Sequence, residues 1–306
     1  MTENPHRPFF EHGELQLRIV EAIERAQERG ALHPIETSLV QVADHDVTFA
    51  VRVACCRSDL ADEKSESRQH HHAAAERDPF LPVDSDLHVA DVSDTHVAVL
   101  NKYPVMERHI LVVTRRHEHQ DELLTVADFY AAWRCLAEAD GLVFFNCGIV
   151  AGASQQHKHL QFIPYPLSDS VSRPPIDGLV EESLNDNRNT VSCFVFRHVL
   201  AAIEWIPTGD PSQSARTSHL LYLEMLKQAG VALSVADTTK TSPYNLLLTR
   251  RWMIVIPRRR EAFEGISING LGFAGCLFLR DASQLEIVKL AGPMHALETV
   301  AGSTRA

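Results

Sequence analysis

The chain has few cysteines, and none of them form a metal-binding or redox pair. Six occur among 306 residues, with Cys55 next to Cys56 and the other four scattered, and no Cys-x-x-Cys motif is present. This scarcity argues against a disulfide scaffold and favours reduced, buried thiols. Because no cysteine-pair motif for zinc is available, we predict that the protein holds no stoichiometric structural zinc.

Long apolar runs and an excess of positive charge are also missing. No uninterrupted apolar run approaches the roughly 18 residues of a membrane span. Residues 1–14 are polar and lack the apolar core of a signal peptide. The net charge of −11 argues against general nucleic-acid binding. We therefore expect a cytoplasmic protein, a monomer or small homo-oligomer, that binds neither membrane nor nucleic acid.

The chain does have enough apolar residues for a sizeable core, since they make up 45% of its sequence. Helical periodicity or capping residues mark four segments: 14–30, 125–140, with Thr125 as N-cap, 219–230 and 283–299. β-branched or alternating residues predict strands at 47–53, 96–100, 109–114, 142–145, 157–163, 191–199, 244–249, 252–256 and within 268–279. This pattern favours an α+β fold with a largely antiparallel sheet and helices packed on one face.

Residues 166–190 are rich in proline, serine and aspartate and form the best candidate for a linker. We predict halves at 1–165 and 166–306, which can still form one compact domain. Each half contains a predicted hairpin that ends in basic residues, 96–116 in the first and 244–256 in the second. This parallel is compatible with a diverged internal duplication.

The most informative segment reads Gly-Ala-Ser-Gln-Gln-His-Lys-His-Leu-Gln from residue 152. Side chains alternate along a strand, so every second residue would share a face. One face would carry His157, His159 and Gln161, and the opposite face Lys158, Leu160 and Phe162. The preceding loop contains Gly148 and Gly152, so its backbone can turn sharply and its N–H groups can hold phosphate oxygens. An imidazole beside such a loop is suited to nucleophilic attack on phosphorus.

These residues resemble the diadenosine tetraphosphate phosphorylases, or ATP adenylyltransferases, which belong to the histidine-triad superfamily near the galactose-1-phosphate uridylyltransferases. Further similar blocks occur in the family's order: Asp-Pro-Phe-Leu-Pro from 78, Leu-Asn-Lys-Tyr-Pro-Val from 100, Phe-Asn-Cys-Gly from 145, Tyr-Asn-Leu-Leu-Leu-Thr-Arg from 244 and Ile-Asn-Gly-Leu-Gly-Phe-Ala-Gly from 268. Several blocks in order are far more specific than one short pattern. The resemblance implies a histidine-triad-like fold.

The resemblance also implies an activity. It predicts that inorganic phosphate splits diadenosine 5',5'''-P1,P4-tetraphosphate (Ap4A) reversibly into ATP and ADP, with the adenylyl group held covalently on His159 and His157 in a positioning role. Adenylyl sulfate would be a compatible second substrate. Gln161 stands where hydrolytic relatives carry histidine, and its amide can hold a phosphate oxygen but cannot shuttle a proton, which favours transfer. No organic cofactor is implied, although Mg²⁺ or another divalent ion can accompany the polyphosphate.

Further substrate contacts follow from the same resemblance. They are assigned to Asn101, Lys102, Asn146, Gly152, Ala153, Ser154, Gln155, Gln161, Asn269, Gly270, Leu271, Cys276 and Arg280. The family tends to have methionine where Cys276 stands and lysine where Arg280 stands. Lys64 is the candidate for a phosphate-binding lysine near the N-terminus.

Alternative interpretations remain open at this stage. His157 and His159 could be metal ligands or surface histidines, Ser154 a turn residue, and the Asn269–Gly270 pair only a tight turn. The chain could also be a sugar-1-phosphate nucleotidyltransferase or a non-catalytic nucleotide sensor. Several other residues are interpreted as structural or solvent-exposed: Arg250, Arg251, the run 258–260, His109, His117, His119, the polar loop 57–77 with its three histidines at 70–72, and the core residues Trp133 and Trp252.

Overall fold

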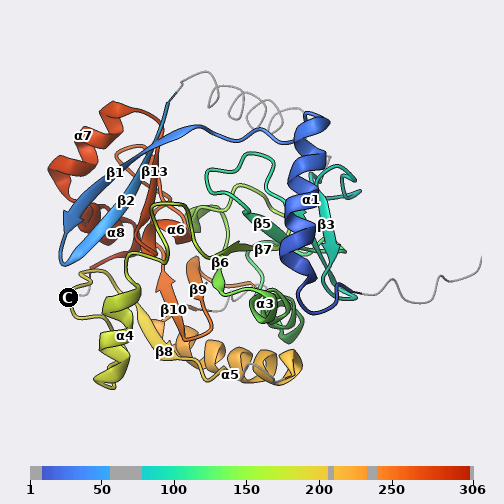
Figure 1. Cartoon of the computed structure of the whole chain (residues 1–306). Helices are drawn as coiled ribbons and strands as arrows, with labels where there is room; N and C mark the ends of the chain where they lie inside the picture. Colours follow the sequence, from blue (N-terminus) through green and yellow to red (C-terminus); the bar gives the residue numbers. More distant parts are fainter. Residues whose placement is uncertain (1–8, 56–77, 206–209, 233–239, 304–306) are drawn as a thin grey trace, which may run out of the picture.

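An eight-stranded sheet contains strands from both halves of the sequence (Figure 1). The structure is a computed structural model and describes residues 9–55, 78–205, 210–232 and 240–303. All neighbouring strands of this sheet are antiparallel, which confirms the predicted α+β class with its largely antiparallel sheet. In spatial order the strands are β3 (His88–Asp91), β4 (His96–Leu100), β5 (Ile110–Thr114), β7 (His159–Pro164), β6 (Gly141–Asn146), β9 (Tyr244–Leu248), β10 (Trp252–Pro257) and β8 (Val199–Ala202).

The two halves of the sequence meet within this sheet. β6 pairs with β9 from Val143 opposite Leu248 to Asn146 opposite Asn245. The two predicted hairpins are confirmed as β4–β5 and β9–β10, and they lie on opposite sides of the β7–β6 pair. The segment 166–190 contains helix α4 (Asp177–Asn185), whose Val180 is buried. The division at residue 165 and the internal duplication remain predictions.

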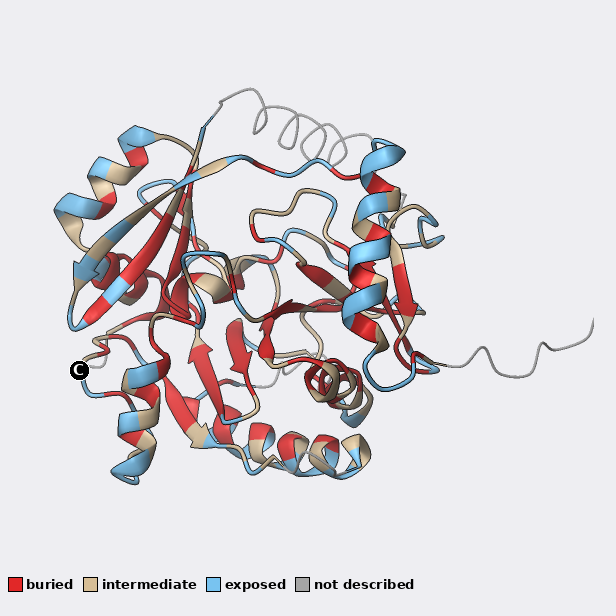
Figure 2. Ribbon diagram, viewed as in Figure 1, coloured by how far each residue is buried: buried red, intermediate tan, exposed pale blue. Residues whose placement is uncertain are grey.

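Three helices cover one face of the large sheet: α1 (Glu14–Glu28), α3 (Val126–Glu138) and α5 (Pro211–Ala229) (Figure 1). Their buried residues face the sheet and their exposed residues face outward (Figure 2). Helix α3 begins with the predicted capping box, in which Thr125 and Asp128 each accept a hydrogen bond from the other's backbone N–H. Trp133 is buried in this layer, as predicted, and its indole N–H donates to Ser218.

The opposite face is covered as well, by elements from both ends of the chain. A three-stranded sheet consists of β1 (Thr37–Asp44), β2 (Val47–Ala54) and β13 (Cys276–Leu279), in which β13 runs parallel to β2. The other elements on this side include α4, α6 (Gly270–Phe273), α7 (Ala282–Ala291), α8 (Pro293–Ala301) and the short hairpin of β11 (Ala262–Phe263) with β12 (Ile266–Ser267). Trp252 is buried in this second layer, as predicted.

Two expectations about elements are wrong. The predicted closing helix is two helices, because Gly292 has a φ of 86° and Pro293 has no N–H to continue the helical bonds. The predicted strand at 191–199 is absent except for Val199, where β8 begins. The N–H of Val191 donates instead to His198 Nε2 at 2.8 Å, so a side chain replaces the neighbouring strand as its partner.

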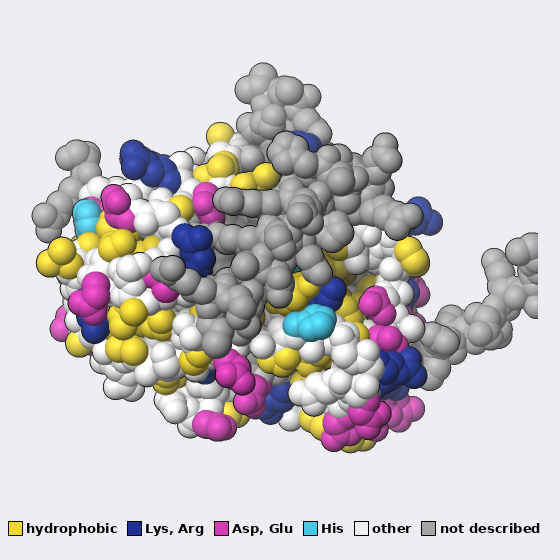
Figure 3. All heavy atoms as spheres, turned by 90° about the horizontal axis from the view of Figure 1, so that it is seen from above, with side chains coloured by type: hydrophobic (Ala, Val, Ile, Leu, Met, Phe, Trp, Pro, Cys, Tyr) yellow, Lys and Arg dark blue, Asp and Glu magenta, His cyan; other side chains and the backbone are white. Residues whose placement is uncertain are grey.

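The face of the molecule seen in Figure 3 mixes charges of both signs. On the coloured part of Figure 3, basic and acidic side chains are interspersed, and no continuous basic area gathers there. Within the described segments no helix is long and apolar enough to cross a membrane. Polar side chains are instead buried on the large sheet, among them His109, His157, His159, Asn146 and Asn245.

Candidate active site

His159 is the first residue of β7, and its side chain is buried. Its Nδ1 lies 2.9 Å from the carbonyl oxygen of His157. A carbonyl can only accept, so Nδ1 carries the proton and Nε2 keeps the lone pair. Burial lowers the pKa of His159 to about 4, although its bond to His157 acts in the opposite direction. The ring is therefore neutral at physiological pH and presents a nucleophilic nitrogen.

The backbone of His159 is held by Gln120, a residue that sequence patterns did not single out. Gln120 Oε1 accepts the N–H of His159 at 2.8 Å, and Nε2 donates to the His159 carbonyl at 3.2 Å. The same Nε2 donates to the Asn146 carbonyl at 2.9 Å. Gln120 thus connects the start of β7 to the end of β6. A single glutamine in a polar loop carries no local signal for this role.

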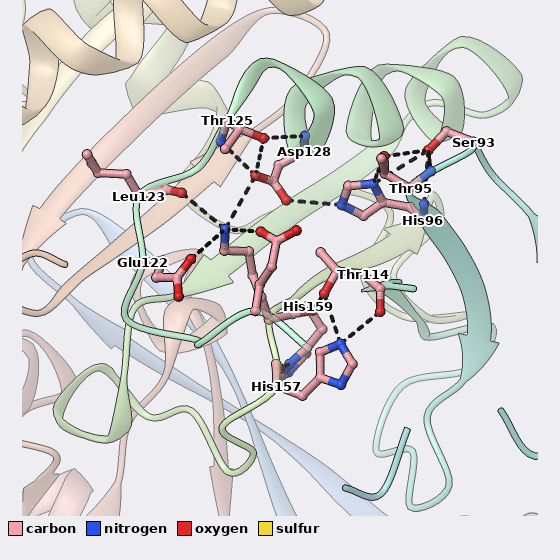
Figure 4. Close-up of polar contacts among 12 residues, drawn as sticks. Ser93, Thr95, His96, Thr114, Glu122, Leu123, Thr125, Asp128, His157 and His159 are labelled. Atoms are coloured by element: carbon pink, nitrogen blue, oxygen red, sulfur yellow. Dashed lines mark hydrogen bonds and ion pairs between the residues drawn. The ribbon is translucent and has the colours of Figure 1, made fainter. Parts of the chain in front are cut away.

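His157 precedes β7 and has polar partners at both ring nitrogens, of which Figure 4 shows the one at Thr114. Its Nδ1 lies 2.7 Å from Asp78 Oδ2, and its Nε2 lies 2.8 Å from the Thr114 carbonyl and 2.9 Å from Thr114 Oγ1. The ring of Phe80 contacts both imidazoles, with centroid distances of 5.6 Å to His157 and 5.4 Å to His159. These contacts hold the His157 ring in place, and they put the 78–80 block beside His159.

Lys158 points to the other face, as the alternation predicts, but it is buried like its neighbours. Its Nζ lies 2.6 Å from Glu118 Oε2, 3.2 Å from the Leu123 carbonyl and 3.8 Å from Asp128 Oδ2. Asp128 also accepts a hydrogen bond from His96 Nε2 at 3.0 Å (Figure 4). Burial would raise the pKa of Asp128, but the His96 bond and the Lys158 charge lower it overall. Carboxylate partners therefore anchor Lys158, the residue between His157 and His159.

The loop after β6 has the backbone conformation that its glycines allow. Gly148 and Gly152 have φ values of 76° and 88° and flank the short helix η1 (Ile149–Ala151). A Cβ on Gly152 would lie 2.8 Å from the Cβ of Asn269 and from the Ile268 carbonyl. The second half of the chain therefore packs directly on this loop. Ala153 is buried, Gln155 is half-buried and Ser154 is exposed.

Asn146 is buried at the end of β6 with its amide orientation fixed. Its Oδ1 accepts from the Gly270 N–H at 2.9 Å and from Asn245 Nδ2 at 2.8 Å. Its Nδ2 donor has no hydrogen-bond partner among the described residues. Asn269 is the N-cap of α6, since its Oδ1 accepts the Leu271 N–H at 3.0 Å. Three of the predicted binding positions, 146, 269 and 270, thus lie side by side, and the Nδ2 of Asn146 remains available as a donor.

Arg258 supplies a second link between the halves, so the prediction of a solvated loop at 258–260 is wrong for this residue, whereas Arg259 and Arg260 are exposed as predicted. Its side chain is buried, and Nη1 donates to Asn245 Oδ1 at 2.7 Å and to the Ala151 carbonyl at 3.1 Å. Burial lowers the pKa of Arg258 to about 10, so it keeps its charge at neutral pH. A positive charge therefore lies behind the glycine loop. Arg250 is only partly exposed too, because it donates to the Leu136 and Ala137 carbonyls.

The structure also corrects the interpretation of His109, which is buried rather than on the surface. Burial lowers the pKa of His109 to about 4; His159 lowers it further, whereas Gln161 acts in the opposite direction. His117 lies close to His157, with a centroid distance of 5.2 Å. His119 forms an isolated bridge with His157 in the backbone. These histidines therefore belong to the surroundings of the motif.

Other predicted contact residues lie apart from these bonds. Cys276 is buried in β13 opposite Ala50, and Arg280 donates to the Gly265 carbonyl. Lys102 is exposed, with its ammonium 5.3 Å from the centre of its neighbour's ring at Tyr103. Residues 57–77, with Lys64 and the histidines at 70–72, lie outside the described residues. Among the residues that are described, no group of three or more His, Cys, Asp or Glu side chains could hold a metal ion.

Comparison with known families gives two matches that divide the chain. Residues 5–182 match the Ap4A phosphorylase N-terminal domain, and residues 192–303 match the ATP adenylyltransferase C-terminal domain. Among curated proteins, diadenosine 5',5'''-P1,P4-tetraphosphate phosphorylase 2 of Saccharomyces cerevisiae is 28% identical over 271 residues, which cover 78% of this chain and 77% of the relative. Protein APA1 of the same yeast is 26% identical over 205 residues, covering 60% and 61%.

Solved structures show the same fold. The crystal structure of yeast Ap4A phosphorylase Apa2 in complex with AMP superposes with a TM-score of 0.74 at 23% identity, covering 98% of this chain and 100% of the other. The complex of the yeast enzyme with Ap4A gives a TM-score of 0.73 over the same shares. The whole described arrangement, from the large sheet to the small one, is therefore a known architecture.

The buried neutral histidines predict a loss of stability in acid. His109 and His159 stay neutral in the fold down to about pH 4, whereas in the unfolded chain the pKa of histidine is about 6.5. The unfolded state therefore binds more protons between these values, and the free energy of unfolding falls as the pH falls through them. Each histidine contributes a loss of roughly 3 kcal/mol at pH 4. Urea unfolding between pH 4 and 7 measures this dependence.

His159→Gln should make that dependence shallower by close to one proton. His45→Gln, which removes an exposed imidazole at a turn, is the matched control. If the slope in His159→Gln equals that of the wild type, the imidazole is charged in the fold, and its assignment as a neutral nucleophile is wrong.

Lys158→Met should lower the free energy of unfolding by about 3 kcal/mol, because it leaves the buried Asp128 and the Glu118 carboxylate without their cation. The control is Lys289→Met, which removes an exposed ion pair with Glu286 and should cost less than about 1 kcal/mol. Equal losses in the two variants, measured by chemical unfolding at pH 7, would contradict the anchoring role of Lys158.

Proposed function

Because this chain belongs to the Ap4A phosphorylase family, we propose that it catalyses phosphorolysis of Ap4A through an adenylyl group held on His159. The predicted family and the predicted class of enzyme, a nucleotidyltransferase, are confirmed by these matches. The observation that carries the proposed mechanism is the bond between His159 Nδ1 and the His157 carbonyl. This bond leaves Nε2 of a buried, neutral ring as the attacking atom.

The proposed cycle has two displacements at the same phosphorus. His159 Nε2 attacks the α-phosphorus of Ap4A, a phosphorus–nitrogen bond forms, and the bond to the departing ATP oxygen breaks. An oxygen of inorganic phosphate then attacks the adenylyl group, the phosphorus–nitrogen bond breaks, and ADP leaves. Both steps are reversible. Adenylyl sulfate offers the same adenylyl group with sulfate as leaving group and is proposed as a second substrate.

Donors fixed before the substrate arrives support this assignment. The Nδ2 of Asn146 has no hydrogen-bond partner among the described residues, and its carbonyl end is held by the Gly270 N–H. Such preorganised donors stabilise the charge that develops on phosphate oxygens in the transition state. Arg258 adds a buried positive charge behind the loop. We further propose that Mg²⁺ or another divalent ion accompanies the polyphosphate and screens its charge.

Gln161 is proposed to make phosphate, rather than water, the acceptor. Its side chain is half-buried and lies on the same face of the sheet as His159, because the two residues are separated by two positions in β7. An amide has no proton acceptor of useful basicity near pH 7, whereas attack by water requires that a proton be removed. Phosphate is already anionic and needs no such help.

The cytoplasmic location of the protein also remains a prediction.

His159→Ala should lower the rate of Ap4A phosphorolysis by roughly 10³-fold or more, as expected for loss of a nucleophile. Acid-labile AMP should accumulate on the wild-type protein when Ap4A is supplied without phosphate, and none should form on the variant. His198→Gln, which removes a buried neutral imidazole elsewhere, is the control for loss of packing. Near-normal turnover in His159→Ala would refute the covalent mechanism.

Gln161→His should shift the product from ADP toward AMP when phosphate is scarce. A histidine can take the proton from water, and such help is typically worth about 10²–10⁴-fold. The ratio of AMP to ADP is measured at several phosphate concentrations in the wild type and the variant. An unchanged ratio would mean that exclusion of water, and not the amide, enforces transfer.

A further inference from the structure

His109 lies beside Gln161 on the catalytic face of the sheet. It immediately precedes β5, where Leu111 is opposite Gln161 in β7, so His109, Leu111 and Gln161 share one face. Its ring is only 6% exposed and lies 5.8 Å from the ring of Phe144, measured between centroids. His109 also contacts Asn101, whose Nδ2 is 3.2 Å from His109 Nδ1.

The orientation of the Asn101 amide follows from its contact with the backbone. The N–H of Tyr103 donates to Asn101 Oδ1 at 3.1 Å. A backbone N–H can only donate, so the atom it meets is the oxygen, and the NH₂ group faces His109. That NH₂ group can also only donate. His109 Nδ1 therefore accepts and carries no proton.

The proton of the neutral ring then lies on Nε2. Burial keeps the ring neutral by lowering the pKa of His109 to about 4. Nε2 has no hydrogen-bond partner within bonding distance among the described residues, although its atom is fully buried. Gln161 is the amide that interacts with this ring and partly offsets the effect of burial on its pKa. Since Asn101 occupies Nδ1, the nitrogen available to Gln161 is Nε2.

We propose that Asn101 and His109 are positioning residues that set the orientation of the Gln161 amide. In this arrangement, the Asn101–His109–Gln161 triplet, Nε2–H of His109 donates to Oε1 of Gln161. The NH₂ group of Gln161 then faces the phosphate oxygens bound at His159. Catalytic hydrogen bonds are often long before substrate binds, and this one shortens as the amide engages phosphate. The inference rests on the proposed function, because it specifies how that site holds the group being transferred.

The reversed amide would present oxygen lone pairs to an anionic phosphate. Rotation of a terminal amide costs little by itself, so an isolated glutamine could adopt either orientation. The triplet removes this freedom, because every donor and acceptor along it is determined by the Tyr103 N–H. Losing one hydrogen bond to a charged oxygen should slow phosphorolysis by about 10–100-fold.

The first test determines which nitrogen of His109 carries the proton, without reference to activity. ¹⁵N NMR of the full-length protein labelled in its histidine rings, with His109→Gln used to assign the resonance, should show the proton on Nε2. In Asn101→Asp the carboxylate still accepts from Tyr103 but cannot donate, so the proton should move to Nδ1 and the Gln161 amide should reverse. A wild-type ring with its proton on Nδ1 would overturn the proposal.

The second test is kinetic and uses pairs of variants. His109→Phe should lower kcat for Ap4A by about 10–100-fold with a smaller change in the KM for Ap4A, since the orienting donor is lost. His109→Gln should recover most of that loss, because its amide N–H replaces Nε2–H. In a Gln161→Ala background, His109→Phe should have no further effect. An equal effect of His109→Phe with and without Gln161 would show a merely structural role and refute the triplet.

The two tests separate the proposals from each other. A wild-type protein that binds Ap4A but does not split it with phosphate would refute the proposed function, and the NMR result would still decide the protonation of His109. Active wild-type protein with the proton on Nδ1 would refute the triplet alone. Circular dichroism and thermal unfolding show whether each variant is folded, and Asn101→Asp and His109→Gln keep the proposal testable if His109→Phe does not fold.

Discussion

The hydrogen bond between His159 Nδ1 and the His157 carbonyl imposes the requirements that much of the surrounding structure meets. It exists only if the backbone from 157 to 159 keeps one conformation. Gln120 holds the peptide groups of His159, and the His157 ring is held by Thr114 and Asp78. The residue between them, Lys158, is anchored on the other face by its bond to Glu118. His159 is thus fixed from both sides of its strand, so under the proposed mechanism its lone pair needs little reorganisation when phosphorus arrives.

A second feature is that the amides near the nucleophile have determined orientations. Asn146 accepts from the Gly270 N–H, and Asn101 accepts from the Tyr103 N–H, so backbone donors decide which end of each amide is the oxygen. Each amide NH₂ is then directed elsewhere. In a buried site of low dielectric constant, donors that already point the right way are worth more than donors that must reorient.

Neither half of the chain could form this arrangement alone. The pairing of β6 with β9 puts Asn146 opposite Asn245, and Asn245 in turn receives a hydrogen bond from Arg258. Gly152 approaches Asn269 so closely that no side chain fits between them. The glycine loop is therefore shaped by residues about 100 positions away, since the Asn245–Ala151 bond spans 94 residues and the Gly270–Asn146 bond spans 124.

Local features of this protein were determined by the sequence itself. The two hairpins, the capping box of α3 and the two faces of the His-x-His-x-Gln segment depend on periodicity and on residues a few positions apart, so their patterns were sufficient to predict them. The closing helix and the strand at 191–199 failed because a local breaker, Pro293, and a side-chain acceptor, His198, replaced the expected backbone bonds.

Tertiary structure alone decided the roles of Gln120, His109 and Arg258. Each is a polar residue that resembles a surface residue in sequence, and each is buried with hydrogen-bond partners that other segments of the chain supply. Burying a polar group is costly unless such partners exist, and their existence depends on how remote strands and loops come together. Periodicity shows which face of a strand a residue occupies, but it cannot show what lies across from that face.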